Sequence, residues 1–329
     1  MIGPDSMRDV TAEAGRRLHA LDRLLPAARE LPAGCGLALA ATDSAGRVTA
    51  VACCEHWTAQ PGSLDLTWGA ARRFRLTPMI TGHDHVTGQD RVTGQNSVAE
   101  SLDQLLTQWR EHLADVEDAA QGDSGAVVIW PSRDVEGVLT LQRHGLIPLS
   151  VIAARTAGSA PARSGHDAAI RRAGPDDADV VTALGLELVR YDNYFGEVVE
   201  RPETEEGLRE ASVRMLADPR PWVWLAERDG IAVGLLATEP PPDATWIAPL
   251  TGSAPVAYLQ QGVVLPGERG AGVGGRLVER YHAEADAAGV AVTLLHYSQV
   301  NPLSAPFWSQ QGYRPLWTTW ETRPARTLR

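Results

Sequence analysis

Hydrophobic and polar positions along the chain follow two periodicities, and both recur in each half. Apolar residues three or four positions apart predict amphipathic helices, which we expect at residues 11–30, 97–118, 138–145, 176–194 and 277–285. Short apolar runs bounded by Gly, Asp or Pro predict strands, which we expect at residues 36–41, 48–53, 126–130, 146–152, 168–173, 222–237 (a hairpin), 257–264, 290–297 and 313–317. Residues 63–96 follow neither pattern clearly, apart from a strand-like piece at 64–68. This mixture of elements indicates an α/β (α+β) fold.

The second half of the chain repeats the order of elements of the first half. Residues 145–149 read Gly-Leu-Ile-Pro-Leu, and their counterpart at 312–316 reads Gly-Tyr-Arg-Pro-Leu. At the same offset, Trp130 falls on Tyr297. An internal duplication of one α/β unit is a more economical explanation than chance similarity.

A stretch with linker composition separates the two copies. Residues 156–166 are rich in Ala, Gly and Ser and carry no apolar periodicity, which is typical of a linker. We therefore predict one domain over residues 1–155 and a second over residues 167–329.

A glycine-rich turn joins the strand at 257–264 to the helix that follows it. Residues 269–275 read Arg-Gly-Ala-Gly-Val-Gly-Gly. The first turn of a helix carries free N–H groups and the positive end of the helix dipole, so it can bind an anion. Glycines allow the backbone to approach a phosphate closely. The turn therefore predicts a phosphate-binding site.

Composition and charge describe a soluble globular protein. Of 329 residues, 44% are hydrophobic and 22% are charged, and the net charge is −11. This charge argues against nucleic acid or an anionic membrane as partner and favours small cationic molecules. No apolar run approaches the ~18 residues of a membrane span. The start of the chain lacks the pattern of a signal peptide, so we expect a cytoplasmic location.

Cysteine and histidine positions predict no metal site. Three cysteines, two of them adjacent at Cys53 and Cys54, fit neither a disulfide framework nor a zinc knuckle. His83 and His85 flank Asp84 at a spacing that could ligate a metal. Because no further ligand cluster accompanies them, we interpret this segment as a polar loop.

Two segments of the second half carry a family resemblance. Arg269-x-x-Gly272-x-Gly274 follows a strand, and residues 301–313 run from an asparagine to Gly-Tyr. Together they resemble the GNAT superfamily of acyl-CoA-dependent N-acetyltransferases, in its [Gln/Arg]-x-x-Gly-x-[Gly/Ala] signature and its Asn-to-Gly-Phe segment. Two such units in one chain resemble tandem GNAT proteins, each unit being a mixed central sheet flanked by helices.

The resemblance is uneven between the two copies. It covers residues 168–325 and, more faintly, 11–155. In the first copy, Asn96 stands where the loop should end in glycine. The resemblance thus implies that the first domain is degenerate and non-catalytic, and that it stabilises or shapes the second.

The family likeness implies a site for acetyl-CoA as co-substrate, without a metal. The loop would hold the pyrophosphate, and the strand before it would pair with the pantetheine arm. Asn301 would position coenzyme A or a water, although a helix cap explains it equally well. The implied cofactor-binding residues are Val263, Val264, Leu265, Arg269, Gly270, Ala271, Gly272, Val273, Gly274, Gly275, Asn301 and Phe307.

The implied reaction is direct attack of an amine on the thioester. A backbone N–H near Val263 would polarise the thioester carbonyl. The family often has a tyrosine that protonates the departing thiolate, but Trp308 stands at that position. Tyr297 and His296 are therefore our candidate acid–base residues, with Ser304 and Tyr313 as alternatives, unless the thiolate leaves without a dedicated acid. A structural role is the competing interpretation of His296.

The segment after the helix at 176–194 corresponds to the family's variable acceptor region. It combines carboxylates with aromatic residues, a mixture that could receive a cationic amine. A solvated acidic face is the alternative interpretation. We expect the substrate-binding residues to be Tyr191, Asp192, Tyr194 and Gln260.

These features lead to one main functional hypothesis and one alternative. The main hypothesis is an acetyltransferase acting on a primary amine of a small molecule, as a monomer or homodimer. The alternative is a catalytically weak acyl-CoA-binding or regulatory module, favoured by Trp308 and by the lack of a carboxylate on the central strand. A dinucleotide-binding dehydrogenase fits poorly, since the glycine spacing differs and the loop comes late in its unit.

Overall fold

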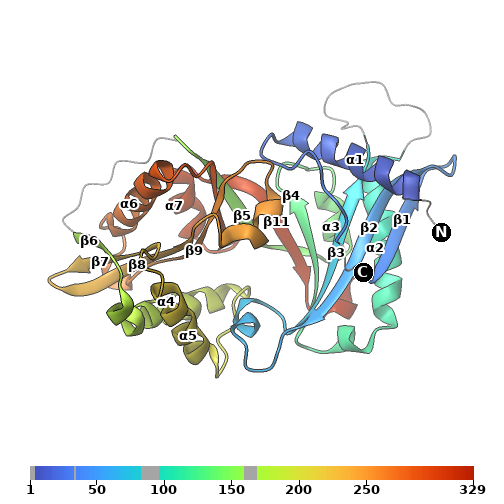
Figure 1. The fold of residues 1–329 in the computed structure, drawn as a ribbon. Helices are drawn as coiled ribbons and strands as arrows, with labels where there is room; N and C mark the ends of the chain where they lie inside the picture. Colours follow the sequence, from blue (N-terminus) through green and yellow to red (C-terminus); the bar gives the residue numbers. More distant parts are fainter. Residues whose placement is uncertain (1–3, 33–34, 83–95, 159–168) are drawn as a thin grey trace.

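One twisted, mixed sheet flanked by helices dominates the molecule (Figure 1). The computed structural model describes residues 4–32, 35–82, 96–158 and 169–329. Within these ranges the sheet has 11 strands. This architecture confirms the predicted fold class. None of the helices in these ranges is both long and apolar enough to cross a membrane.

The elements alternate along both halves much as the apolar pattern predicts. The first half comprises α1 (Pro4–Leu21), β1 (Leu37–Thr42), β2 (Val48–Thr58), the 3-10 helix η1 (Leu64–Trp68), β3 (Arg72–Ile80), α2 (Val98–Ala114), β4 (Ser124–Pro131), α3 (Val138–Arg143) and β5 (Ile147–Thr156). The second half comprises β6 (Ala169–Arg172), α4 (Ala178–Asp192), η5 (Asn193–Phe195), α5 (Thr204–Leu216), β7 (Val223–Arg228), β8 (Ile231–Glu239), β9 (Val256–Val264), η8 (Pro266–Glu268), α6 (Val273–Ala287), β10 (Val292–Ser298), α7 (Ser304–Gln310) and β11 (Arg314–Thr322).

Local chemistry explains where the best-predicted helix begins. The Ser97 hydroxyl accepts a hydrogen bond from the Glu100 N–H over 3.2 Å, and the Glu100 carboxylate accepts one from the Ser97 N–H over 2.7 Å. This reciprocal capping box satisfies two N–H groups that the helix cannot. Leu102, Leu105 and Leu106 then face the sheet and are fully buried. Each such burial stabilises the fold by roughly 1.5–3 kcal/mol.

The structure differs from the predicted elements in four places. Residues 64–68, expected as a strand, form η1, and the following β3 was not expected at all. Helix α5 was also missed, because its sequence is largely polar on the outside. Helix α1 ends at Leu21, five residues before Pro26.

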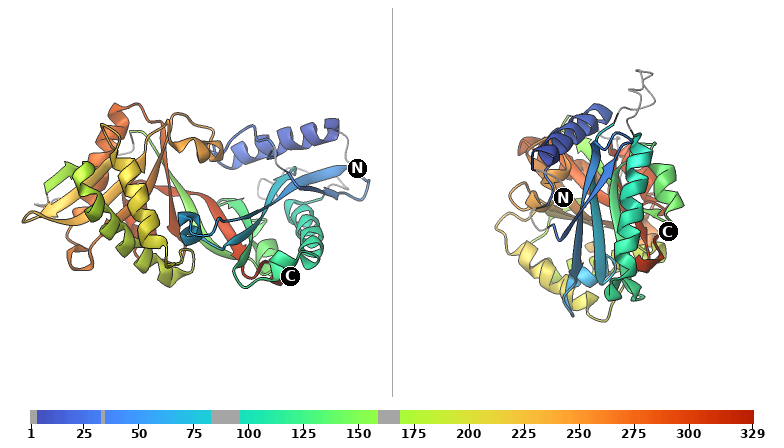
Figure 2. Two further views of the ribbon diagram at one scale, coloured as in Figure 1. Left: turned by 60° about the horizontal axis from the view of Figure 1, so that its bottom comes forward. Right: turned by 90° about the vertical axis from the view of Figure 1, so that its right-hand side faces the viewer.

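Helices cover both faces of the sheet in each half (Figure 2). In the first half, α1 packs on one face through Val10 and Ala14, and α2 packs on the other. In the second half, α6 and α7 cover one face, whereas α4 and α5 lie on the opposite side.

The last strand of each half crosses into the other half. The strand order is β1-β2-β3-β4-β11-β5-β10-β9-β8-β7-β6. Strand β5 pairs with β10, with Val151 opposite Tyr297, and β11 pairs with β4, with Trp320 opposite Val128. In Figure 1, β5 and β11 lie side by side at the centre of the molecule. The two halves are therefore interlocked through hydrogen-bonded strands, and the boundary at 156–166 stays a prediction about sequence units.

Strands β9 and β10 diverge at the centre of the second half. Their parallel pairing starts at Val256 and Val292 and ends at Leu259 and Leu295. The pairing of β9 with β8 shifts register at Gln260, which marks a β-bulge. Beyond it β9 follows β8 only, so a wedge opens between β9 and β10.

Candidate functional site

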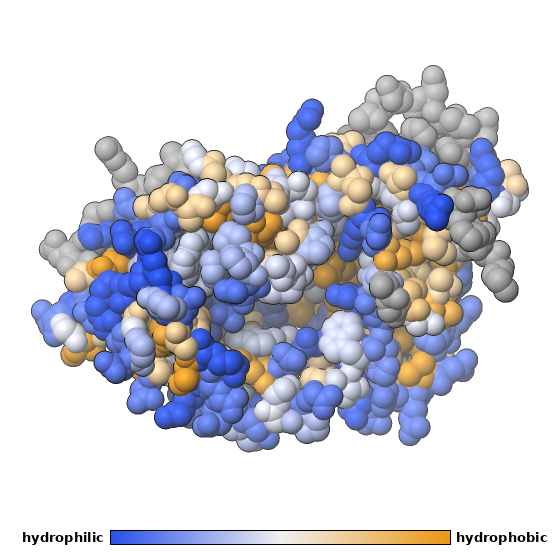
Figure 3. Space-filling model, in the orientation of Figure 1, coloured by the Kyte–Doolittle hydropathy of each residue, from blue (hydrophilic) through white to orange (hydrophobic). Residues whose placement is uncertain are grey.

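A large cavity runs through this wedge and between the two halves of the molecule. Its volume is about 1490 Å³. It extends from the turn at 269–275 past β9 and β10 to residues of β2, β3 and β4. Figure 3 shows a hollow in the middle of the face seen in Figure 1. A space of this size accommodates an extended ligand together with a second molecule.

The glycine-rich turn forms the entrance to α6 at one end of the cavity. Gly270 and Gly272 have φ values of 79° and 81°, a left-handed conformation that glycine adopts without strain. The first helical hydrogen bond runs from the Arg276 N–H to the Gly272 carbonyl over 3.1 Å. The N–H groups of the three preceding residues have no acceptor within the helix. They point out of the helix start, where they suit a phosphate.

Gly274 has a different reason to lack a side chain. A Cβ there would come within 3.2 Å of the Phe307 ring. The bare backbone lets α6 lie against α7 beside the cavity. The turn therefore fits the pyrophosphate of coenzyme A through the free N–H groups at the start of α6.

The Arg269 side chain turns toward β9 and α4. Its Nε donates a hydrogen bond to the Val264 carbonyl over 3.0 Å. Its guanidinium lies over the Tyr191 ring, 4.4 Å from the centroid. Arg269 thus links the turn to the end of α4. In this conformation it is hydrogen-bonded to the Val264 carbonyl, which lies on the cavity side of β9.

Backbone alternation along β9 corrects one expectation. The Leu265 N–H donates to the Val233 carbonyl over 2.9 Å, on the β8 side. Since alternate residues of a strand direct their N–H groups the same way, the Val263 N–H also faces β8. The N–H groups that face the wedge belong to Gly262 and Val264. A donor to a thioester in the wedge would therefore come from one of these two neighbours rather than from Val263.

Asn301 joins the loop after β10 to the end of α4. Its amide donates a hydrogen bond to Asp192 over 3.2 Å, and its carbonyl oxygen accepts one from the Leu303 N–H over 3.0 Å. Burial raises the pKa of Asp192 to about 6, against the lowering effects of the Asn301 hydrogen bond and the Arg269 charge. The contact with Leu303 lies at the start of α7 and is consistent with a capping role for Asn301. The contact with Asp192 is consistent with a role in the site.

His296 and Tyr297 lie on opposite faces of β10. His296 Nδ1 lies 3.1 Å from the Tyr258 hydroxyl, and its ring stacks near Trp246. Burial lowers the pKa of His296 to about 4, so it is neutral near pH 7 and accepts protons only weakly. This environment favours hydrogen bonding by His296 over general base catalysis.

Among the candidate proton donors to a thiolate, Tyr297 is the phenol at the cavity. Burial raises its pKa above the usual value. Tyr313 is buried away from the cavity, with its hydroxyl 3.1 Å from His282 Nε2. Trp308 packs against the backbone of β9, where a Cβ on Gly262 would lie 3.3 Å from its ring.

Most of the residues predicted from sequence meet at the cavity. Lining it are Tyr191, Asp192, Gln260, Val263, Val264, Arg269, Gly270, Ala271, Gly272, Val273, Gly274, Gly275, His296, Tyr297, Asn301 and Phe307. Leu265 and Tyr194 are not among the lining residues. The Tyr194 side chain is 84% exposed, which argues against the substrate contact that we expected of it. The roles of the other residues stay predictions.

Several carboxylates of the cavity were missed as site residues. Glu239, at the end of β8, accepts a hydrogen bond from Trp246 Nε1 over 2.8 Å, and burial raises its pKa. Glu197 follows η5, and burial raises its pKa to about 7, opposed by a Ser150 hydrogen bond. For Glu239, the only available signal in the sequence is the three prolines that follow it, which mark the end of a strand. The sequence offers no such signal for Glu197.

Clusters of metal-ligating side chains are absent from the part of the chain that the structure describes. There, no group of three or more His, Cys, Asp or Glu side chains is placed to hold an ion. The segment His83–His85 lies outside the described residues.

Sequence comparison assigns this site to a family. Residues 189–313 match the model of the acetyltransferase (GNAT) family. The second half of the chain carries a GNAT domain. The match begins near the end of α4 and ends after α7, so it contains the wedge, the glycine-rich turn and Asn301. No curated protein matches the sequence.

The solved structure of one GNAT protein shares the fold, and another aligns more loosely. A GCN5-related N-acetyltransferase from Sphaerobacter thermophilus aligns over 97% of this chain and 92% of its own, with a TM-score of 0.56 and 15% identity. A GCN5-related glucosamine N-acetyltransferase region of a fungal multi-domain β-N-acetylglucosaminidase aligns over 87% of this chain and 33% of its own, with a TM-score of 0.49 and 13% identity.

A predicted acetyltransferase from Clostridium acetobutylicum, solved with acetyl-CoA, aligns with part of the chain. It covers 45% of this chain and 90% of its own, with a TM-score of 0.36 and 16% identity. Of these three likenesses, the one to the Sphaerobacter protein supports the shared fold, and at 15% identity it supports the fold alone. The family match supports an acyl-CoA-dependent N-acetyltransferase activity in general terms.

Proposed function

We propose that the protein transfers the acetyl group of acetyl-CoA to a primary amine of a small molecule, which is cationic before it reacts. The observation that carries this proposal is the continuity of the cavity, from the phosphate-type turn through the wedge to a chamber lined by carboxylates. The turn suits the pyrophosphate, and the wedge gives a narrow arm access to β9. The chamber suits an amine.

The thioester would lie beside β9 with its carbonyl oxygen near a backbone N–H of Gly262 or Val264. Such a donor stabilises the negative charge that develops on the oxygen in the transition state. The amine nitrogen attacks the carbonyl carbon and forms the new C–N bond. The C–S bond then breaks, coenzyme A leaves as a thiolate, and the positively charged nitrogen of the new amide loses its excess proton to water.

The protonated amine must first lose a proton. Glu197 and Glu239 both face the cavity, and we propose Glu197 as the main acceptor, reached directly or through water. Its pKa of about 7 leaves it ionised above neutrality and basic enough to accept a proton. Asp192, with a pKa of about 6, would attract the cationic amine.

The departing thiolate would take a proton from Tyr297. It is the tyrosine of β10 at the cavity, and Trp308, at the position usual for the family's tyrosine, cannot serve as an acid near neutral pH. In this proposal the first half of the chain contributes walls of the cavity but no reacting group.

The test is thiol release from acetyl-CoA in the presence of a panel of primary amines, followed with a chromogenic disulfide. Amine-dependent release, with a product heavier by one acetyl group in mass spectrometry, would support the proposal. Trp308 and the absence of a carboxylate on β9 favour one alternative, an acyl-CoA-binding module. Calorimetric binding of acetyl-CoA without turnover of any amine would support that alternative instead.

A further inference from the structure

The floor of the cavity is one face of the sheet and continues from the second half of the chain into the first. Directly opposed residues of neighbouring strands carry their side chains on the same face. Ser298 on β10 lies opposite Ser150 on β5, which lies opposite Thr319 on β11. Thr319 in turn lies opposite Ile129 on β4. All four residues line the cavity.

The same face continues to β3 and ends at an arginine. Val127, two residues before Ile129 on β4, lies opposite Arg75 on β3. Arg73 precedes Arg75 by two residues, so its side chain lies on the same face. Both arginines line the cavity. Four strand spacings of about 4.8 Å separate β10 from β3, a lateral distance of ~19 Å along the sheet. Arg73 thus lies at the end of the cavity remote from the glycine-rich turn.

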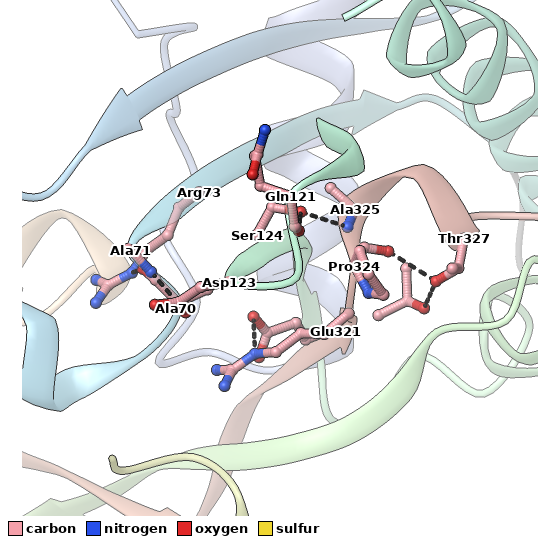
Figure 4. Close-up of polar contacts among 12 residues, drawn as sticks. Ala70, Ala71, Arg73, Gln121, Asp123, Ser124, Glu321, Pro324, Ala325 and Thr327 are labelled. Atoms are coloured by element: carbon pink, nitrogen blue, oxygen red, sulfur yellow. Dashed lines mark hydrogen bonds and ion pairs between the residues drawn. The ribbon is translucent and has the colours of Figure 1, made fainter. Parts of the chain in front are cut away.

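Arg73 is held in place by backbone carbonyls. Its Nε donates to the Ala70 carbonyl over 2.9 Å, and its Nη2 donates to the Asp65 carbonyl over 2.8 Å. It also rests on Gly69, where a Cβ would lie 3.1 Å from Nη2. Figure 4 shows the side chain beside Ala70. These contacts leave Nη1 and one N–H of Nη2 available to a ligand.

The neighbouring carboxylates are engaged elsewhere. Glu321 binds Arg323 through two contacts of 2.8 and 2.9 Å, and Asp123 binds Arg201 over 2.8 Å. In the described part of the chain, no carboxylate oxygen lies within 4.0 Å of the Arg73 guanidinium, and Glu321, Asp65 and Asp123 act on its charge only at longer range. By contrast, the other arginine on this face of β3 is paired with Glu55 over 2.7 Å.

A partly buried guanidinium without a paired carboxylate is costly unless an anion binds it. Burial lowers the pKa of Arg73, but an arginine side chain stays charged at neutral pH. We infer that Arg73 is a subsite for an anionic oxygen group, a carboxylate or a phosphate, at the far end of an elongated amine acceptor. This inference rests on the proposed function, and it makes the first half of the chain a determinant of specificity.

The first arm of the test measures anion binding without turnover. With saturating coenzyme A present, so that the glycine-rich turn is filled, Arg73 is modified with phenylglyoxal and the adduct is quantified by mass spectrometry. Inorganic phosphate and succinate serve as separate probes. We expect at least one of them to slow modification of Arg73 severalfold and to leave Arg72 unaffected. Arg72 lies next to it and is paired with Asp118. Equal modification with and without both probes would overturn the subsite.

The second arm measures selection between acceptors. Glycine oligomers of three to six residues, which extend over ~10–20 Å, are offered as free acids and as C-terminal amides. Phosphoethanolamine and ethanolamine provide the matched phosphate pair. We expect the anionic member of a pair to have a KM roughly 10- to 100-fold lower, the usual range for hydrogen bonds to charged groups, with kcat little changed.

Variants decide whether Arg73 is responsible. Arg73→Ala should remove the preference for the anionic member, and Arg73→Lys should keep part of it. Arg72→Ala is the matched control, and melting temperatures identify any variant that fails to fold. An anion preference that persists in folded Arg73→Ala would overturn the assignment, as would equal use of both members by the wild type. If no amine is acetylated, the proposed function fails, and the protection arm still decides the subsite.

Discussion

Asn301 and Asp192 are joined by a hydrogen bond of 3.2 Å that spans the wedge side of the cavity. One residue follows β10 and the other ends α4, so the contact fixes the distance between the strand and the acceptor region. The same asparagine accepts the Leu303 N–H at the start of α7. Asn301 therefore positions three segments around the proposed site of the amine.

Asn301→Ala should lower stability, because it removes the donor to a buried carboxylate and the acceptor of a backbone N–H. We expect a loss of about 1–3 kcal/mol in the free energy of unfolding, measured by denaturant titration. Asn301→Asp keeps the acceptor but places two carboxylates together, so its deficit should shrink below the pKa of Asp192. A wild-type unfolding free energy in both variants would contradict this account.

Glu197 should control the pH dependence of the reaction. If it accepts the proton of the amine, kcat/KM rises with pH through about 7 and levels off above it. Glu197→Gln should lower the plateau by ~100-fold and abolish this inflection. Glu200→Gln is the control, since Glu200 is exposed in the same segment and paired with Arg190. An unchanged profile in Glu197→Gln would move the role to another group.

The same carboxyl should also make stability depend on pH. Its pKa is raised from 4.5 to about 7 in the folded state, through burial above all and the charges of Asp192 and Glu321. The folded state therefore binds the proton more tightly than the unfolded state. This contribution is complete below pH 4.5 and is lost as the pH rises through 7. Glu197→Gln should match the wild type at pH 4 and exceed it at pH 8, by up to about 3 kcal/mol, in parallel unfolding titrations.

The loop assignment can be tested by charge. Gly272→Glu places bulk and a negative charge at the start of α6, and we expect coenzyme A binding to fall below detection in calorimetry. Gly272→Ala controls for backbone strain, because φ at this position is 81°. Gly267→Glu adds the same charge where a Cβ meets no atom within 4 Å, and it should bind normally. Unchanged affinity in Gly272→Glu would refute the assignment of the pyrophosphate to this turn.

Local patterns in the sequence were enough to predict the strand, turn and helix around 269–275. These patterns also predicted the general fold, because apolar periodicity depends only on residues that are close together in the chain. Strand β3 was not predicted because three of its first four residues are arginines, which break the apolar pattern of a strand. Only the folded structure shows that these side chains lie beside the cavity or pair with residues of other segments. The exchange of β5 and β11 also depends on pairing between distant segments, which periodicity does not encode.

The chemistry of the acceptor chamber was the least predictable part. Glu239, Glu197 and Arg73 come from β8, the segment after η5 and β3. Only the folded sheet brings them to one cavity. Conversely, Tyr194 looked suitable in sequence because it neighbours Asp192, yet the chain turns it to solvent. Sequence proximity is therefore a poor guide to which residues of an irregular segment face a ligand.

Tyr297 provides the last prediction, on the departure of the thiolate. Tyr297 lies on β10 and lines the cavity. Burial raises the pKa of its hydroxyl, so the hydroxyl stays protonated at the pH of the assay. Tyr297→Phe removes the proton without changing the ring, and we expect kcat to fall ~100-fold with little change in the KM for acetyl-CoA. Tyr313→Phe removes a buried hydroxyl near His282 and should leave kcat unchanged. If both variants keep the wild-type kcat, the thiolate leaves without a dedicated acid. That outcome would agree with Trp308 standing at the position where the family often has an acidic tyrosine.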